Sequence, residues 1–292
     1  MSASAPDARN PSLVLIWAFG LFTLIHGHQY IGALLASLAD RVSFDSIMSG
    51  KHETPRTLLI RGSLALIVGL PLVWLCSTLL WKRPTAWMGL GPQWGGLFLG
   101  IELGAAAPIL VVLVLWRMNL ARISLARTGR GHLQVVSAVL GLTAIAVFSG
   151  VSEEIAFRGM MGLELSLTWG WPLAVVVSGA VFGVVHLMGQ TKTLNATKVG
   201  AIMLSSIAVS FLFISLYRFA GSLWLPIGFH VAWNCAHSPF LGLRMNGKEP
   251  LASYLKTTLD SSSWIAGGEA GMEASVPAVA VYCLMGSLFT VL

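Results

Sequence analysis

Apolar stretches of membrane-spanning length run through almost the whole chain. A helix needs about 20 consecutive apolar residues to cross the hydrocarbon core of a bilayer, and about eight stretches reach that length. They lie near residues 13–38, 57–81, 94–116, 132–150, 171–189, 197–217, 222–241 and 273–292. No soluble domain fits between them, because even the longest polar stretch, 242–271, is only a Gly- and Ser-containing loop. The sequence therefore predicts an all-α bundle of about eight transmembrane helices.

The charge content supports a membrane location and argues against a nucleic-acid partner. Only 10% of the residues are charged and 55% are hydrophobic, whereas soluble domains carry about 25% charged residues. The net charge of +6 does not come from one patch, because the basic residues gather at the ends of apolar stretches, as in loops that face an anionic leaflet. These residues are Lys82, Arg83, Arg117, Arg122, Arg127 and Arg130. We expect an integral membrane protein in contact with the lipid bilayer, and no binding of nucleic acid.

The polar motifs divide the chain into three parts. Residues 1–131 hold three apolar stretches, residues 132–241 hold all the motifs described below, and residues 242–292 hold a loop and a last helix. The three cysteines lie in apolar segments and form no C-x-x-C pair, so neither a disulfide framework nor a cysteine zinc site is predicted.

The first polar motif is Ser-Glu-Glu-Ile-Ala-Phe-Arg at residues 152–158, directly after an apolar stretch. Ionisable groups are expensive within a bilayer, so they mark a functional site by default. Glu153 and Glu154 are neighbours and point about 100° apart on a helix. Glu154 stands four residues before Arg158, the favourable order for an ion pair, which leaves Glu153 free to face a cavity as a base. The alternative is an ordinary helix end with its charges at the interface.

Two further motifs place side chains one helical turn apart. Phe182 and His186 share one face of a helix, and so do His230 and Asn234. A single histidine in a membrane helix is often a packed, hydrogen-bonded residue, and paired polar residues can also join helices by hydrogen bonds. Three helices that each carry such a face nevertheless predict a lined cavity with a base, an orienting group and polar donors.

The depth of the motifs constrains the helix that carries Glu153. If this helix began at His132, Glu153 would lie about 31 Å along it at 1.5 Å per residue, at the far face of the bilayer, where His186 could not reach it. The two residues meet if the membrane-crossing part runs over residues 143–166, with Glu153 about 15 Å deep. We therefore expect residues 118–142 to include an interfacial or tilted piece.

Together the motifs resemble the signature of one family. Glu-Glu-x-x-x-Arg, Phe-x-x-x-His and His-x-x-x-Asn, in this order across residues 135–240, are similar to the CPBP family, which comprises type II CAAX prenyl endopeptidases and bacteriocin-processing and self-immunity proteins. The stretch 221–230 also resembles bacterial members of that family. The resemblance implies a membrane-embedded endopeptidase of the bacterial plasma membrane, which acts near the C-terminus of a peptide or lipidated protein.

The resemblance also implies a role for each motif residue. Glu153 and His186 would activate the attacking water. His230 and Asn234 would polarise the scissile carbonyl and stabilise its oxyanion, a contribution of about 3–4 kcal/mol per donor. The residues that would orient or enclose these groups are Glu154, Arg158 and Phe182.

Two mechanisms fit this set of residues. Glu153, His186 and His230 offer two imidazoles and one carboxylate, which is a zinc set with one open position. The chain lacks the local zinc-peptidase pattern H-E-x-x-H. We therefore expect a metal-free glutamate mechanism, with zinc as the alternative cofactor.

Two other functions fit membrane-embedded Glu and His residues. A proton- or ion-coupled carrier would use them as a relay, but the chain shows no internal repeat of the kind found in many transporters. A non-catalytic scaffold or immunity factor would not need the complete set of Glu153, His186, His230 and Asn234. The intact set favours proteolysis.

Overall fold

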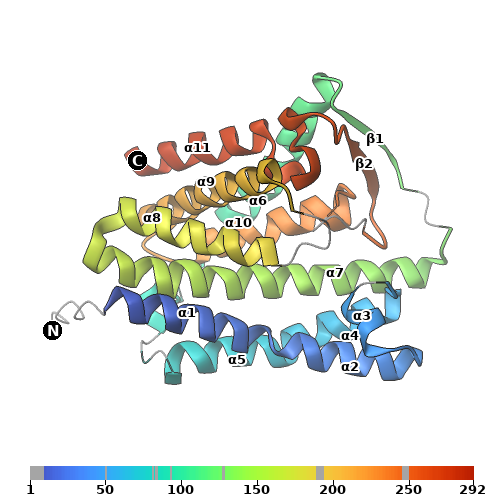
Figure 1. Ribbon diagram of the computed structural model, residues 1–292, viewed down its shortest axis with the longest axis horizontal. Helices are drawn as coiled ribbons and strands as arrows, with labels where there is room; N and C mark the ends of the chain where they lie inside the picture. Colours follow the sequence, from blue (N-terminus) through green and yellow to red (C-terminus); the bar gives the residue numbers. More distant parts are fainter. Residues whose placement is uncertain are drawn as a thin grey trace.

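Long helices lie side by side and make up most of this computed structural model (Figure 1). The structure describes residues 10–49, 51–80, 82, 85–92, 94–126, 129–188, 194–244 and 250–292. The N-terminal helices are α1 (Pro11–His26), α2 (His28–Asp40), α3 (Phe44–Met48), α4 (Pro55–Leu64), α5 (Leu70–Leu75) and α6 (Gly95–Arg117). The C-terminal helices are α7 (His132–Glu153), α8 (Leu163–Met188), α9 (Ala196–Ala220), α10 (Trp224–Cys235) and α11 (Val276–Val291). The all-α prediction is confirmed.

Short helical segments of other types join or extend these helices. Four are π-helical: Ala65–Gly69, Cys76–Leu80, Glu154–Gly162 (η4) and Ala236–Phe240 (η5). Four are 3-10 helices: Thr85–Met88, Trp264–Ala266, Gly268–Ala270 and Met272–Ala274. As a result, α7 and α8 form one helical run through η4, and α10 continues into η5.

Four helical stretches are long and apolar enough to cross a membrane, judged by length and composition within the described residues. The longest has 57 residues, and the chain reverses within it at Gly170, whose φ of 73° is not helical, so that the rest of α8 returns alongside α7 (Figure 1). Two of the basic residues at expected helix ends, Arg83 and Arg127, lie outside the described residues. The four stretches are Pro55–Leu79, Gly95–Arg117, His132–Met188 and Ala196–Ala220. An integral membrane bundle is confirmed.

The helix that carries Glu153 is longer than predicted. The apolar stretch 132–150 ends where charged residues begin, but the helix continues through η4 and the first turns of α8 to the break at Gly170. The run includes residues 143–166, the part expected to cross the membrane, and the charges of the motif do not stop the helix because they are paired inside the bundle. The expected first helix, 13–38, is also divided, at Gly27, into α1 and α2.

A two-stranded antiparallel sheet lies at one end of the bundle (Figure 1). Strand β1 (Ala121–Leu125) pairs with β2 (Leu255–Leu259) along its full length. The Thr257 hydroxyl donates to the Leu241 carbonyl oxygen at 2.7 Å, which ties β2 to the residue after η5. We expected an interfacial or tilted piece within residues 118–142 and a loop over 242–271. The two strands were missed because five residues carry too short a pattern to be recognised.

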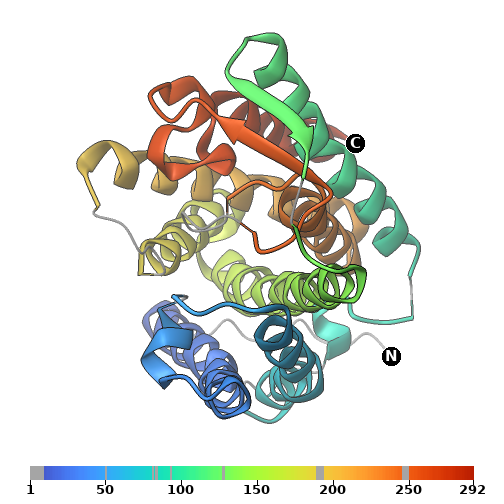
Figure 2. The same ribbon diagram turned by 90° about the vertical axis from the view of Figure 1, so that its right-hand side faces the viewer.

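Helix α10 lies between two apolar clusters of buried side chains. Leu223 and Ile227 pack with α7, η4 and α8, and Phe229 and Trp233 pack with α6, α9 and α11. Helix α6 approaches the backbone of α10 so closely that a Cβ at Gly104 would overlap the Phe229 carbonyl. Figure 2 looks along the helices and shows the blue N-terminal helices on one side of α7 and the orange and red helices on the other. Helix α10 is thereby held between α6 and α7, which carries the first motif.

Candidate active site

The first motif runs from the last turn of α7 into the π-helical segment η4. All nine residues of η4, Glu154–Gly162, are buried, whereas Glu153, directly before them, is half-buried. Stretches of π-helix are rare and frequently occur at functional sites. The two neighbouring acids of the motif therefore have different surroundings.

Glu154 accepts two hydrogen bonds with one carboxylate oxygen. Arg158 Nη1 donates to Oε1 at 3.1 Å, and both side chains are 0% exposed. His230 Nδ1 donates to the same oxygen at 2.7 Å. An ionised carboxylate only accepts hydrogen bonds, so His230 carries a proton on Nδ1. The ion pair predicted from the i, i+4 spacing is confirmed, and it also orients a histidine from another helix.

Glu153 faces the opposite nitrogen of the same imidazole. Its Oε2 lies 3.8 Å from His230 Nε2, and the two side chains are 14% and 10% exposed. The His230 ring is thus placed between two carboxylates, one fully buried and one accessible. The accessible edge, formed by Glu153 and His230 Nε2, is where a bound molecule could meet the cluster.

Two aromatic rings enclose the Arg158 guanidinium. The carbon Cζ lies 4.7 Å from the ring centroid of Phe182 on α8 and 4.7 Å from that of Phe213 on α9. Phe213 also stacks on His230, with centroids 5.3 Å apart and planes at 16°. Arg158 Nε and Nη2 are buried without a hydrogen-bond partner among the described residues, so the ring faces stabilise much of the cation. Phe213 therefore holds both Arg158 and His230.

His186 joins this cluster through Phe182. The two rings lie 4.2 Å apart between centroids, and His186 Nδ1 donates to the Phe182 carbonyl oxygen at 2.9 Å. When the ring is neutral, that hydrogen bond leaves Nε2 without a proton and able to accept one. The ring of Phe182 therefore lies in contact with both His186 on α8 and Arg158 on η4.

Asn234 lies one turn beyond His230 on α10 and contacts α7. Its Nδ2 donates to the hydroxyl of Ser149 at 3.0 Å. Ser149 is one turn before Glu153 on α7, so the pair Ser149–Asn234 runs parallel to the pair Glu153–His230. The polar residues of two neighbouring helices therefore face each other at two successive levels.

All seven residues singled out in the sequence belong to this region, and two more participate. Ser149 shares a helix face with Glu153, and that spacing could have pointed to it. Phe213 stands in an apolar helix with no polar motif, so the sequence offered no signal for it. Both were missed.

The described residues contain no group of three His, Cys, Asp or Glu side chains arranged to hold a metal ion. Of the predicted zinc set of Glu153, His186 and His230, a direct contact is present between Glu153 and His230. As placed, these three residues do not form a zinc site. The metal-free mechanism stays a prediction.

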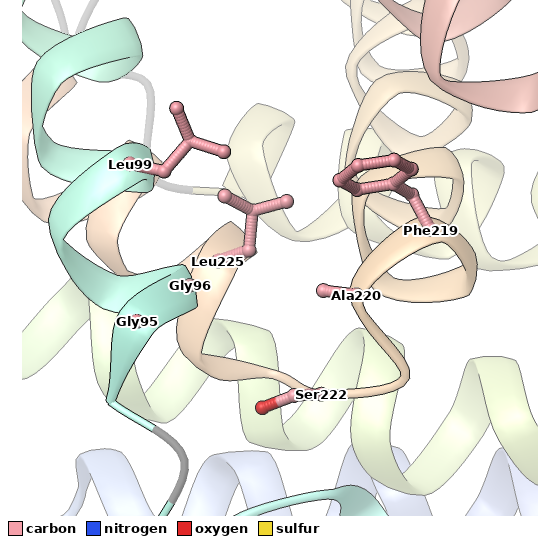
Figure 3. Close-up of a pocket in the computed structure, with 7 residues that line it drawn as sticks. All are labelled: Gly95, Gly96, Leu99, Phe219, Ala220, Ser222 and Leu225. Carbon is pink, nitrogen blue, oxygen red and sulfur yellow. The ribbon is translucent and has the colours of Figure 1, made fainter. Parts of the chain in front are cut away.

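A separate cavity of about 320 Å³ lies between the start of α6, the end of α9 and the start of α10 (Figure 3). Its lining is apolar except for Ser222, whose hydroxyl donates to the Gly89 carbonyl oxygen at 2.7 Å. None of the residues of the three motifs lines it. The lining residues are Gly95, Gly96, Leu99, Phe219, Ala220, Ser222 and Leu225.

The motif region matches a known protein family. A family model described as "Type II CAAX prenyl endopeptidase Rce1-like" matches residues 135–236, which include every motif residue, most of α7 and all of η4, α8, α9 and α10. Comparisons with curated proteins and with solved structures gave no match. The match falls on the part of the chain in which the buried polar cluster lies.

Proposed function

Since residues 135–236 form a domain of the CPBP family of intramembrane peptidases, we propose that this protein cleaves a membrane-associated peptide or protein near its C-terminus. The observation that supports this most is the placement of His230 between a fully buried and an accessible carboxylate. Such a set, held within an apolar bundle, suits the hydrolysis of a peptide bond. We place the protein in the bacterial plasma membrane, with a peptide or lipidated protein as its substrate.

Glu153 is the general base in this proposal. It takes a proton from a water molecule while the water oxygen attacks the scissile carbonyl carbon, and a C–O bond forms as the carbonyl becomes an oxyanion. When the oxyanion collapses, the C–N bond breaks and the proton on Glu153 passes to the leaving amine. His186, whose Nδ1 donates to the Phe182 carbonyl oxygen, helps to hold the attacking water through Nε2.

His230 and Asn234 stabilise the oxyanion. With Nδ1 donating to Glu154, His230 has Nε2 left for the substrate, and this nitrogen donates when the ring carries its second proton. Asn234 uses one N–H for Ser149 and has a second one available. Donors fixed before the reaction lower the barrier because they need no reorientation in the transition state.

Arg158, Glu154 and Phe182 support these groups without contacting the substrate. Arg158 offsets the buried charge of Glu154, and Glu154 fixes the ring of His230. Phe182 packs on both Arg158 and His186. The supporting residues thus hold the polar groups in one geometry inside an apolar surrounding.

The proposal is tested by cleavage of a fluorogenic peptide library with protein in nanodiscs. Glu153→Gln and His186→Ala should each abolish cleavage, while Glu102→Gln, an exposed acid on α6 outside the site, should leave it unchanged. Cleavage should also resist a zinc chelator. Loss of activity on chelation, restored by zinc, would replace the glutamate mechanism by a metal-dependent one. No cleavage by the wild type, or proton flux in liposomes that depends on Glu153, would overturn the peptidase proposal in favour of a scaffold or carrier.

A further inference from the structure

Helices α7 and α10 approach each other closely next to the site. The close approach requires glycine at position 150, because a Cβ there would lie 2.9 Å from the backbone nitrogen of Val231. The residue before Gly150 is Ser149, and its hydroxyl meets Asn234 Nδ2 at 3.0 Å. The contact joins two helices across 85 positions of sequence, so it is not imposed by local helix geometry.

The hydrogen bonds of Ser149 determine the orientation of the Asn234 amide group. Ser149 Oγ also contacts the carbonyl oxygen of Ala146 at 3.2 Å, and that oxygen can only accept. A hydroxyl has one proton to donate, and Ser149 donates it in the hydrogen bond to the Ala146 carbonyl oxygen. Ser149 can therefore only accept from Asn234, so the NH₂ group of the amide, and not its oxygen, must face α7.

We propose that Ser149 is a positioning residue that fixes the amide of Asn234 for oxyanion stabilisation. This inference rests on the proposed peptidase function. With one N–H held by Ser149, the second N–H has a set direction, and the Asn234 side chain makes no other hydrogen bond among the described residues. Without Ser149 the amide can turn over and present its oxygen, which would repel an oxyanion instead of stabilising it.

Substitutions at Ser149 test this role by their effect on kcat. Ser149→Ala should lower kcat about tenfold with little change in KM, since a group that acts only in the transition state changes kcat. Ser149→Thr keeps the hydroxyl and should restore most of the activity. Ser166→Ala is the matched control. Its hydroxyl donates in the same way to the carbonyl oxygen three residues back, that of Leu163, but Ser166 belongs to none of the motifs, and kcat should not change.

The same substitution in the Asn234→Ala background separates positioning from general damage. If Ser149 acts through Asn234, adding Ser149→Ala to Asn234→Ala should cause no further loss of kcat. A further tenfold loss, an equal effect in the Ser166→Ala control, or failure of Ser149→Thr to restore activity would overturn the inference.

A stability cycle tests the contact without relying on activity. Melting temperatures of wild type, both single variants and the double variant should be non-additive, because the two residues share one hydrogen bond. Additive shifts would overturn the inference even if the enzyme is active. If wild type and Glu153→Gln behave alike in the peptide assay, the proposed function fails, and the positioning role fails with it whatever the melting temperatures show.

Discussion

Glu154→Gln should destabilise the folded bundle, because it leaves the guanidinium of Arg158 buried without its ionised partner. Both side chains are 0% exposed and joined at 3.1 Å, and the same oxygen holds His230 at 2.7 Å. Removing one partner of a buried ion pair costs about 3–5 kcal/mol. At about 2 °C per kcal/mol for a chain of this size, the melting temperature should fall by roughly 6–10 °C.

The double variant Glu154→Gln with Arg158→Met separates charge from packing. Replacing both partners of a buried pair by neutral groups of similar size is often neutral for stability, so the double variant should melt above Glu154→Gln alone. It should nevertheless be inactive, because His230 loses the carboxylate that orients it. The assay is thermal unfolding in nanodiscs followed by tryptophan fluorescence, with Glu102→Gln as the control.

Two outcomes would refute this reasoning. Glu154→Gln could melt within 2 °C of the wild type, which is roughly 1 kcal/mol and would mean that Arg158 does not depend on Glu154. The double variant could instead fall by the sum of the two single shifts, which would mean that the residues act independently and that the ion pair is not a unit.

Three other perturbations have defined expected results. Phe213→Leu should lower kcat and leave KM nearly unchanged in the peptide assay, because His230 loses the ring that stacks on it and its orientation loosens. Gly104→Ala should lower the melting temperature by forcing α6 away from the α10 backbone, and unchanged melting would contradict that close contact. Asp40 at the end of α2 gives a pH effect: burial acts to raise its pKa, but hydrogen bonds, first of all from Thr54, outweigh burial and lower it. Its stabilising contribution is therefore full above the unfolded-state pKa and lost as the pH falls through the folded one, so Asp40→Asn should weaken the acid dependence of melting between about pH 2 and 6.

The sequence predicted the polar cluster well because each motif residue follows helical spacing. The Glu154–Arg158 pair and the shared face of Phe182 and His186 depend only on the geometry of one helix, and both are present. The conflict over the depth of Glu153 also pointed in the right direction, since the helix that carries it runs well past residue 150.

The parts that the sequence did not predict depend on contacts between distant segments. Phe213 reaches Arg158 and His230 only because α9 packs beside them, and an apolar residue in an apolar helix gives no sign of that. The partners of Glu154 were predicted only in part for the same reason. Helical spacing identified Arg158, but the hydrogen bond from His230 joins residues 76 positions apart in the sequence. The sheet was missed because β1 and β2 are each short and pair across the region that carries all three motifs.

The long helical run that carries Glu153 also bears on the length of substrate that the site can accept. The run from residue 132 to the break at Gly170 is roughly 55 Å long at 1.5 Å per residue, against about 30 Å of hydrocarbon core, so part of it stands outside the bilayer. If the core begins near residue 143, Glu153 lies about 15 Å below that level. An extended peptide advances about 3.3 Å per residue, so in the proposed peptidase four or five residues would bring a scissile bond from the membrane surface to Glu153. A peptide end shorter than that would have to carry an apolar anchor into the bilayer with it.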